Sequence, residues 1–195
     1  MKFQHPSGER AVVAALKDVT GWFADDVDGA IIGGIAASIR GNPRLTRDID
    51  AVILADDLGW ERALESAKRH GLAPRIDDPL GFAARSRMLL LRHVATAIQV
   101  DISLGALPFE REAVERSSVV KVGSLRLPLV TAEDLVIMKA VARRPQDIGD
   151  IEAVLDRHPN LDLSRIRHHL REFSSVLEMP EIYDDFEKLL RRRNK

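Results

Sequence analysis

The stretch GAIIGGIAASIRGNPRLTRDIDAVIL, residues 29–54, decides the fold. Its first residues, Gly29 to Ile32, form a short apolar run typical of a β-strand, which continues directly into Gly33 and Gly34. The run from Ile35 to Arg40 has the composition of a helix and is followed by Gly41, a residue type that favours helix termination. The pattern therefore predicts a strand, a tight turn and a helix in direct succession.

Two aspartates begin the next expected strand, Asp48 to Leu54. In a β-strand, side chains two residues apart lie on the same face, so Asp48 and Asp50 point the same way. The rest of this strand is apolar and typical of a strand covered on both faces, where an unpaired carboxylate is costly. We therefore expect a cationic partner for the two carboxylates.

A third aspartate, Asp101, lies in another apolar strand. The runs Arg87 to Arg92 and Ala97 to Ser103 are close enough in sequence to form a hairpin. If the second run neighbours the strand of Asp50, three carboxylates repel one another at one sheet edge. A hard divalent cation relieves this repulsion, because it prefers carboxylate oxygens and commonly binds through protein acids together with substrate phosphates. The three acids therefore predict a metal site and a phosphate-bearing substrate.

Such a site has a defined chemical use. Two divalent ions held side by side clamp the attacking and leaving oxygens of a displacement at phosphorus. In this interpretation Asp48 and Asp50 bridge the ions, and Asp101 holds the second ion and orients the acceptor hydroxyl. Gly33 and Gly34 fit the same chemistry, because glycines before a helix let backbone N–H groups approach a phosphate. The structural alternatives are solvent-facing acids on strand ends and a plain glycine turn.

The remaining sequence predicts helices around a sheet. Apolar residues at helical spacing favour a helix from Glu9 to Ala24, and Gly71 is placed to end another, from Asp57 to Arg69. Residues Pro74 to Gly81 have the composition of a loop. A second hairpin at the sheet edge and four C-terminal helices complete the chain: strands 119–122 and 125–129, then helices 131–144, 145–157, 162–173 and 180–193.

The order of these elements predicts a mixed α/β, or α+β, fold. Strands and helices alternate up to residue 129, which gives a mixed sheet flanked by helices, and only helices follow. We therefore expect an α/β domain over residues 1–129 and a small helical domain over residues 130–195 packed against it. The active site is then expected in the cleft between the two.

The composition excludes several kinds of protein. The chain has 195 residues and a formal net charge of -1, so no general attraction to nucleic acid or membrane is indicated. It has no cysteine, which excludes disulfides, thiolate metal sites and cysteine nucleophiles, and its apolar runs are too short for a membrane span. We expect a cytoplasmic protein without a membrane partner. The histidines show no zinc-binding spacing and are interpreted as surface residues.

The motifs resemble a known superfamily. A Gly-Gly turn followed, after a spacer, by Asp-x-Asp is the signature of the polymerase-β-like nucleotidyltransferases, and here the spacer is Ile35 to Arg47. The run Arg44-Leu45-Thr46-Arg47-Asp48-Ile49-Asp50 is similar to the Arg-x-Thr-x-Asp-x-Asp form of the abortive-infection toxin-like (AbiEii-type) branch. A helical motif of that branch, Lys-x-x-Ala-x-x-Arg-x-x-Asp-x-x-Asp, resembles the segment that contains Lys139, Ala142, Arg143, Arg144, Asp147 and Asp150.

This resemblance implies an enzyme that moves NMP from an NTP donor to a hydroxyl of an acceptor, with Mg²⁺, or Mn²⁺ in its place, as cofactor. The residues that it assigns to metal binding and catalysis are Asp48, Asp50 and Asp101. Those that it assigns to the nucleotide are Gly33, Gly34, Arg44, Thr46, Lys139, Arg144, Asp147 and Asp150. For the acids and the lysine of the helical segment, an ion pair between helices is the structural alternative.

The resemblance leaves several hypotheses open for the acceptor. The toxin-like branch implies a tRNA or protein acceptor, which we favour over an antibiotic, and a cognate antitoxin as partner in a toxin-antitoxin system. Antibiotic nucleotidyltransferases modify small molecules instead. A hypothesis from another class is a catalytically inactive nucleotide-binding or partner-binding module with the same fold.

Overall fold

The computed structural model describes residues 6–44, 46–56 and 59–193. The chain separates into two compact units. The first, which we call the sheet unit, comprises Met1–Ala36 and Arg44–Val130. The second, the helical unit, comprises Ala37–Pro43 and Thr131–Lys195. A domain division at residue 129 stays a prediction, and each unit is described by itself below.

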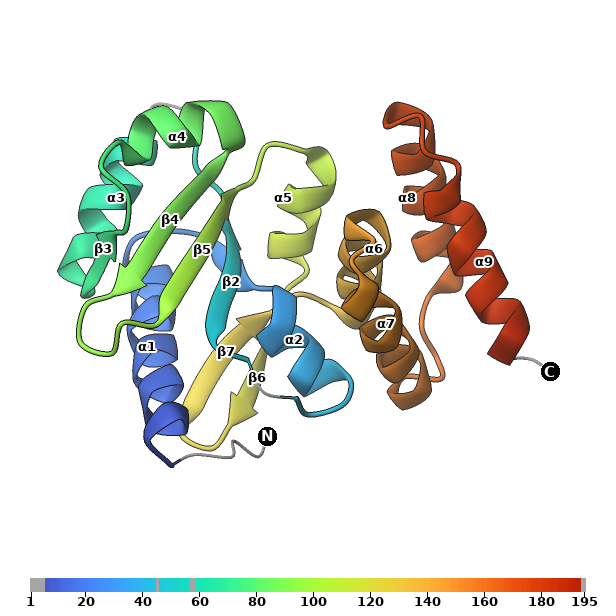
Figure 1. Cartoon of the computed structure of the whole chain (residues 1–195), viewed down its shortest axis with the longest axis horizontal. Helices are drawn as coiled ribbons and strands as arrows, with labels where there is room; N and C mark the ends of the chain where they lie inside the picture. Colours follow the sequence, from blue (N-terminus) through green and yellow to red (C-terminus); the bar gives the residue numbers. More distant parts are fainter. Residues whose placement is uncertain (1–5, 45, 57–58, 194–195) are drawn as a thin grey trace. The chain divides into compact units, whose positions relative to one another are not determined.

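A mixed sheet forms the centre of the sheet unit (Figure 1), with strand order β3-β4-β5-β2-β1-β7-β6. The β2 and β5 strands are parallel, as are β1 and β7, whereas the other neighbours are antiparallel. The bounds are β1 Gly29–Ile31, β2 Asp48–Ile53, β3 Leu72–Pro74, β4 Met88–His93, β5 Gln99–Leu104, β6 Ser118–Val122 and β7 Leu125–Leu129. This order puts β2 and β5, the two aspartate strands, side by side in the middle of the sheet.

Helices cover the sheet and complete its core. The helices that lie wholly in this unit are α1 Pro6–Asp25, α3 Trp60–Arg69, α4 Pro79–Ser86 and α5 Pro108–Glu115. Trp22 of α1 is fully buried, and its ring N–H donates to the Ser66 hydroxyl of α3 at 2.7 Å. Ile49 of β2 and Ile102 of β5 are also fully buried. The apolar residues of β2 and β5 therefore anchor both strands in the core. The acids lie in the first half of each strand.

The helical unit contains α6 Ala132–Ala142, α7 Pro145–Arg157, α8 Leu163–Val176 and α9 Glu181–Arg193. The Thr131 hydroxyl caps α6 by accepting from the Asp134 N–H at 3.1 Å. Pro145 occupies the first turn of α7, where its missing N–H costs nothing. The helix α2, Gly33–Arg40, begins in the sheet unit and ends in this one, where Arg157 donates to the Gly41 carbonyl at 3.2 Å.

The predicted fold class is confirmed, and most predicted elements are present. The stretch Pro74 to Gly81 is not a loop throughout, because it contains the end of β3 and the start of α4. Asp78 caps α4 by accepting from the Gly81 N–H at 2.9 Å. The helix α5 was missed as well, and α6 ends at Ala142 rather than at residue 144. The predicted start of the third helix at Asp57 lies outside the described residues.

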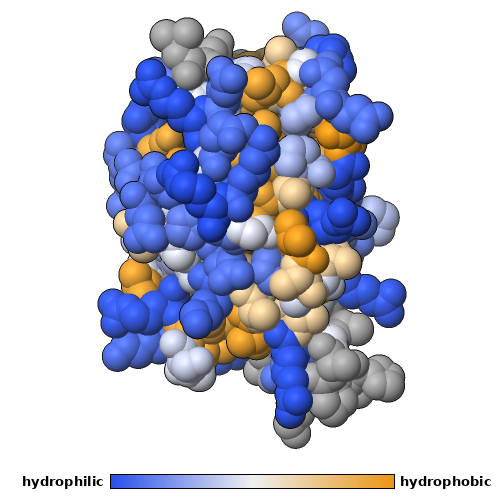
Figure 2. All heavy atoms as spheres, turned by 90° about the vertical axis from the view of Figure 1, so that its left-hand side faces the viewer, coloured by the Kyte–Doolittle hydropathy of each residue, from blue (hydrophilic) through white to orange (hydrophobic). Residues whose placement is uncertain are grey.

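The outer surface of the sheet unit on the side of α3 is largely hydrophilic. Figure 2 shows this side, with hydrophobic side chains in separate patches between charged ones. The exposed face of α3 consists of charged residues, namely Glu61, Arg62, Glu65, Lys68 and Arg69. Within the described residues, none of the helices has the length and apolar character required to cross a membrane.

Candidate active site

Three aspartates lie on one face of the sheet where β2 and β5 run in parallel. Asp50 is directly opposite Asp101 in the register of the two strands, and Asp48 precedes Asp50 by two residues. Residues that are opposite each other on neighbouring strands point to the same face, as do residues two apart. The side chains of Asp48, Asp50 and Asp101 therefore share a face, and we call these three residues the acid row.

The Gly33 turn is built closely around Asp50. Gly33 has a φ of +60°, a conformation that favours glycine, and a Cβ added there would lie 2.0 Å from Asp50 Oδ2. The N–H of Gly34 donates to the same oxygen at 3.4 Å. A plain turn would require only the backbone conformation, whereas this turn also leaves room for a carboxylate. The two glycines and Asp50 thus form one structural feature.

Two residues of the segment before β2 lie beside this turn. A Cβ on Gly34 would be 2.7 Å from the Thr46 methyl group and 3.3 Å from Arg44 Nη2. Thr46 is 4% exposed, and its hydroxyl has no hydrogen-bond partner in the part of the chain that the structure describes. The turn, Arg44 and Thr46 are therefore brought together with Asp50, although their role in nucleotide binding stays a prediction.

An arginine that sequence reasoning missed contacts the acid row. Arg75 Nη2 donates to Asp101 Oδ1 at 2.6 Å. The backbone explains this contact, because the Arg75 N–H bonds to the Leu90 carbonyl at 3.0 Å and Leu90 is opposite Asp101. Arg75 therefore lies next to Leu90 of β4. Leu90 is opposite Asp101 of β5, which is in turn opposite Asp50 of β2. The sequence carried no signal for this pairing, since it depends on the register of β3, β4 and β5.

The acid row fits a divalent cation by its chemistry. Its donors are carboxylate oxygens, the ligands that Mg²⁺ and Mn²⁺ prefer, and the Gly33 turn keeps the space beside Asp50 free of a side chain. Among the described residues, the three carboxylates do not bring an oxygen each to within 4.8 Å of one another. In this arrangement Asp50 accepts from the Gly34 N–H at 3.4 Å, and Asp101 accepts from Arg75 at 2.6 Å.

The other predicted nucleotide-binding residues lie in the helical unit. Lys139 of α6 is buried, and its ammonium group is 2.7 Å from Asp147 and 2.7 Å from Asp150, both on α7. Asp147 also accepts from the backbone N–H of Arg144 at 3.0 Å, while the Arg144 side chain is exposed. The predicted ion pair between helices is therefore present. A role of these residues toward a nucleotide stays a prediction, although Lys139 and Asp147 do line a hollow of about 300 Å³ in this unit.

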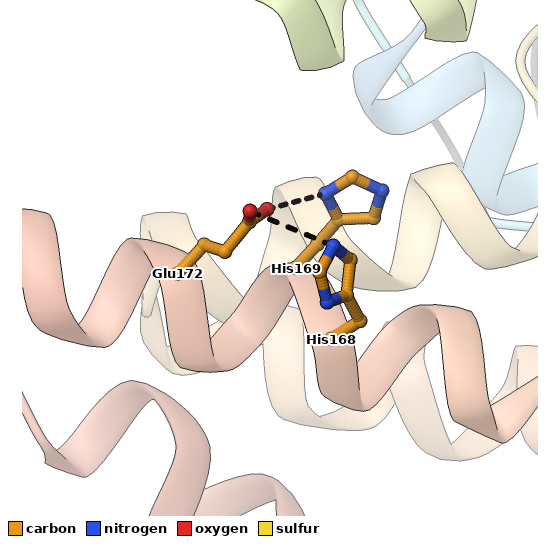
Figure 3. Close-up of side chains that lie close together, drawn as sticks. All are labelled: His168, His169 and Glu172. Atoms are coloured by element: carbon orange, nitrogen blue, oxygen red, sulfur yellow. Dashed lines mark ion pairs between the residues drawn. The ribbon is translucent and has the colours of Figure 1, made fainter.

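Three side chains of metal-ligating types lie close together on α8 of the helical unit (Figure 3). His168 and His169 both turn toward Glu172, at 3.5 Å and 3.2 Å. These spacings are the ordinary four-residue and three-residue pairs of one helix face. The interpretation of the histidines as surface residues was wrong for two of them: His169 is buried, and so is His93, whose ring is 2.8 Å from Asp18 Oδ2.

A large hollow of the sheet unit is separate from the acid row. Its volume is about 880 Å³, and Gly29, Leu54 and Pro128 belong to its lining. Gly29 pairs with Ile53 at the far end of β2, whereas Asp48 begins that strand. The glycine turn and the acid row therefore remain the candidate site of this unit.

The sequence matches a described protein family over residues 11–191, namely the nucleotidyltransferases of unknown function designated DUF6036. The chain belongs to this family. Its fold is a nucleotidyltransferase fold, and the family identifies it as a transferase for which an NTP is the donor. Membership agrees with the resemblance of the Gly-Gly and Asp-x-Asp motifs, while the toxin-like branch is not confirmed.

Solved structures with a similar fold include the antibiotic-resistance factor ANT(2'')-Ia, with a TM-score of 0.60 at 13% identity. That match covers 92% of this chain and 99% of the other. An antigenic nucleotidyltransferase-like protein from Paracoccidioides brasiliensis has a TM-score of 0.47 at 14% identity, over 91% of each chain. The Megavirus polyadenylate synthase has a TM-score of 0.47 at 11% identity, over 80% of this chain and 33% of its own. Comparison with curated proteins gave no match.

Proposed function

We propose that this nucleotidyltransferase moves NMP from an NTP to a hydroxyl group in a reaction that depends on Mg²⁺ or Mn²⁺. The observation that carries the proposal is the Gly33 turn, which is shaped around Asp50 while Asp50 is in register with Asp101. A side chain at position 33 would meet the Asp50 carboxylate, so the turn leaves the space in front of this acid open. The arrangement is explained if Asp50 must present its carboxylate to a metal ion in front of the turn.

The residues of the sheet unit divide the work in this proposal. Asp48 and Asp50 hold the divalent cation, and Asp101 completes its ligands and orients the acceptor hydroxyl. When bound, the cation neutralises the phosphate oxygens and stabilises charge on the attacking and leaving oxygens. The backbone N–H groups at the start of α2, Gly33–Arg40, donate to phosphate oxygens in this proposal. Arg44 and Thr46 border this turn.

Two hypotheses concern the class of acceptor. The resemblance to the toxin-like branch supports a tRNA or protein acceptor and a cognate antitoxin. A small-molecule acceptor is the alternative, since the antibiotic-resistance factor ANT(2'')-Ia has a similar fold. The likeness at 13% identity concerns the fold, so it gives no preference between these acceptors.

The direct test is transfer of label from each α-³²P-labelled NTP, with Mg²⁺ or Mn²⁺, to total cellular RNA, total protein and a panel of antibiotics. We expect wild type to label one of these pools and the Asp48→Ala/Asp50→Ala variant to lose at least about 1,000-fold of that activity. The matched control is Asp184→Ala, because Asp184 is an exposed aspartate of the helical unit. Equal labelling by the double variant and wild type contradicts the proposal.

A nucleotide-binding module without turnover is the second candidate. The pairing of Asp101 with Arg75 favours it, because it withdraws one acid from metal binding in this structure. Calorimetry with Mg²⁺ and each NTP separates the two candidates. Saturable binding with no transfer to any pool supports the module, whereas binding with transfer supports the enzyme.

A further inference from the structure

The Arg75–Asp101 ion pair is partly shielded from solvent. The two side chains are 27% and 25% exposed, and the Nη2 and Oδ1 atoms are 2.6 Å apart. At this distance the bond is a short, charge-assisted one. Arg75 therefore supplies positive charge to a carboxylate that the proposed function assigns to the metal.

The backbone of Arg75 is held by the sheet. Pro74 is the last residue of β3 and is opposite Leu91, so Arg75 directly follows the strand. Its N–H donates to the Leu90 carbonyl at 3.0 Å, and Leu90 is the neighbour of Asp101. The guanidinium thus reaches along the sheet from β3 past β4 to β5. A cation held in this way is part of the site.

We propose that Arg75 is the resident counter-ion of Asp101 and competes with the divalent metal ion for this carboxylate. The inference rests on the proposed function. The guanidinium and a metal ion need the same oxygen lone pairs, and their like charges repel each other at short distance. A bound triphosphate offers the guanidinium another anion, for which arginine has suitable geometry. Metal binding is then weak without nucleotide and stronger with it, and Arg75 couples the two.

The test is Mn²⁺ binding to the full chain, measured by electron paramagnetic resonance without nucleotide and with a non-hydrolysable NTP analogue. We expect Arg75→Gln to bind Mn²⁺ about two- to fivefold more tightly than wild type without nucleotide. The gain in Mn²⁺ affinity that the analogue causes should be smaller in this variant than in wild type. Arg75→Lys keeps the charge and should bind Mn²⁺ nearly as wild type does.

The matched control is Arg69→Gln, because Arg69 forms an ion pair of 2.7 Å with Asp26 on the same unit. It should leave Mn²⁺ binding unchanged, and Asp101→Asn should abolish the gain produced by Arg75→Gln. The proposal is overturned if Arg75→Gln binds Mn²⁺ as wild type does or more weakly. Weaker binding would show that Arg75 orients Asp101 for the metal. If wild type itself shows no saturable Mn²⁺ binding, the proposed metal site fails, and this inference with it.

Discussion

The two units of this protein treat clustered carboxylates in opposite ways. In the helical unit, Asp147 and Asp150 share the buried ammonium group of Lys139 at 2.7 Å each. In the sheet unit, the three acids of the row lie exposed or half-buried, and Asp101 is paired with Arg75 at 2.6 Å. The first cluster is held around one buried cation, whereas the second is open to solvent. This difference separates a structural ion-pair cluster, the buried tie of Lys139 with Asp147 and Asp150, from a candidate metal site.

The largest expected effect concerns the buried tie. Lys139→Met leaves Asp147 and Asp150 without their cation, and we expect the free energy of unfolding to fall by about 3–5 kcal/mol. Urea unfolding followed by circular dichroism measures it. The matched control is Lys68→Met, because Lys68 forms an exposed pair with Glu65, and it should cost less than about 1 kcal/mol. Equal losses in both variants would remove the contrast between the clusters.

The next effect concerns the glycine turn beside the acid row. In Gly33→Ala the new methyl group occupies the place of Asp50 Oδ2, so we expect a loss of about 1–3 kcal/mol of stability. NMP transfer should fall by about 100-fold or more, because Asp50 is displaced. Gly123→Ala is the matched control, since Gly123 also has a φ of +60° but nothing within 4 Å of an added Cβ. Loss of transfer in both variants would show that backbone strain, and not the position of Asp50, decides activity.

A smaller effect is expected at Thr46. Its buried hydroxyl lacks a hydrogen-bond partner among the described residues, so Thr46→Val should raise the free energy of unfolding by about 1 kcal/mol. Thr20→Val is the control, because the Thr20 hydroxyl donates to the Leu16 carbonyl at 2.9 Å and its loss should not stabilise. If Thr46 binds nucleotide, calorimetry will show weaker NTP affinity in the stabilised variant. Unchanged affinity would remove Thr46 from the proposed site.

The smallest effect is a pH dependence in the helical unit. The Arg167 side chain donates to Glu187 at 2.6 Å and holds the pKa of Glu187 below its usual value. A carboxylate whose pKa is lowered by folding stabilises the protein at pH values above its pKa in the unfolded chain, which is about 4.3 for Glu. That contribution is lost as the pH falls through the lower folded pKa.

The measurement is urea unfolding of wild type and Glu187→Gln between pH 7 and pH 3. We expect wild type to be more stable at pH 7 by less than about 1 kcal/mol, because the pair is partly exposed. The difference should shrink as the pH falls. A difference that does not change with pH would show that Glu187 acts through packing and not through its charge.

The sequence was sufficient for the parts of the site that depend on local pattern. The alternation of Asp48 and Asp50 with buried residues predicted their common face, and the glycine turn was predicted from Gly33 and Gly34. The sequence did not predict that β5 lies beside β2. This neighbourhood, which places Asp101 opposite Asp50, is given by the strand order of the sheet. The Gly-Gly and Asp-x-Asp motifs predicted a nucleotidyltransferase, and the family match agrees with that prediction.

One group of features that were not predicted depends on contacts between residues far apart in the sequence. The pairing of Arg75 with Asp101 requires the register of β3, β4 and β5. Two missed helices did carry local signals: Asp78 and Pro79 start α4, and Pro108 with Glu110 starts α5, where the Glu110 carboxylate accepts from Leu107 N–H at 2.9 Å. The burial of His93 followed from its contact with Asp18, 75 residues away, which no local pattern reveals.

The measurement that tests the central claim most directly is the stability gained from Mn²⁺, read as the change in melting temperature of wild type, Asp48→Asn/Asp50→Asn and Asp150→Asn. A ligand that binds only the folded chain raises its free energy of unfolding by RT ln(1 + L/Kd), where L is the free ligand concentration, and so raises the melting temperature. The account predicts that Mn²⁺ raises the melting temperature of wild type and Asp150→Asn but not that of Asp48→Asn/Asp50→Asn. Equal increases in all three proteins, or none in wild type, would contradict it.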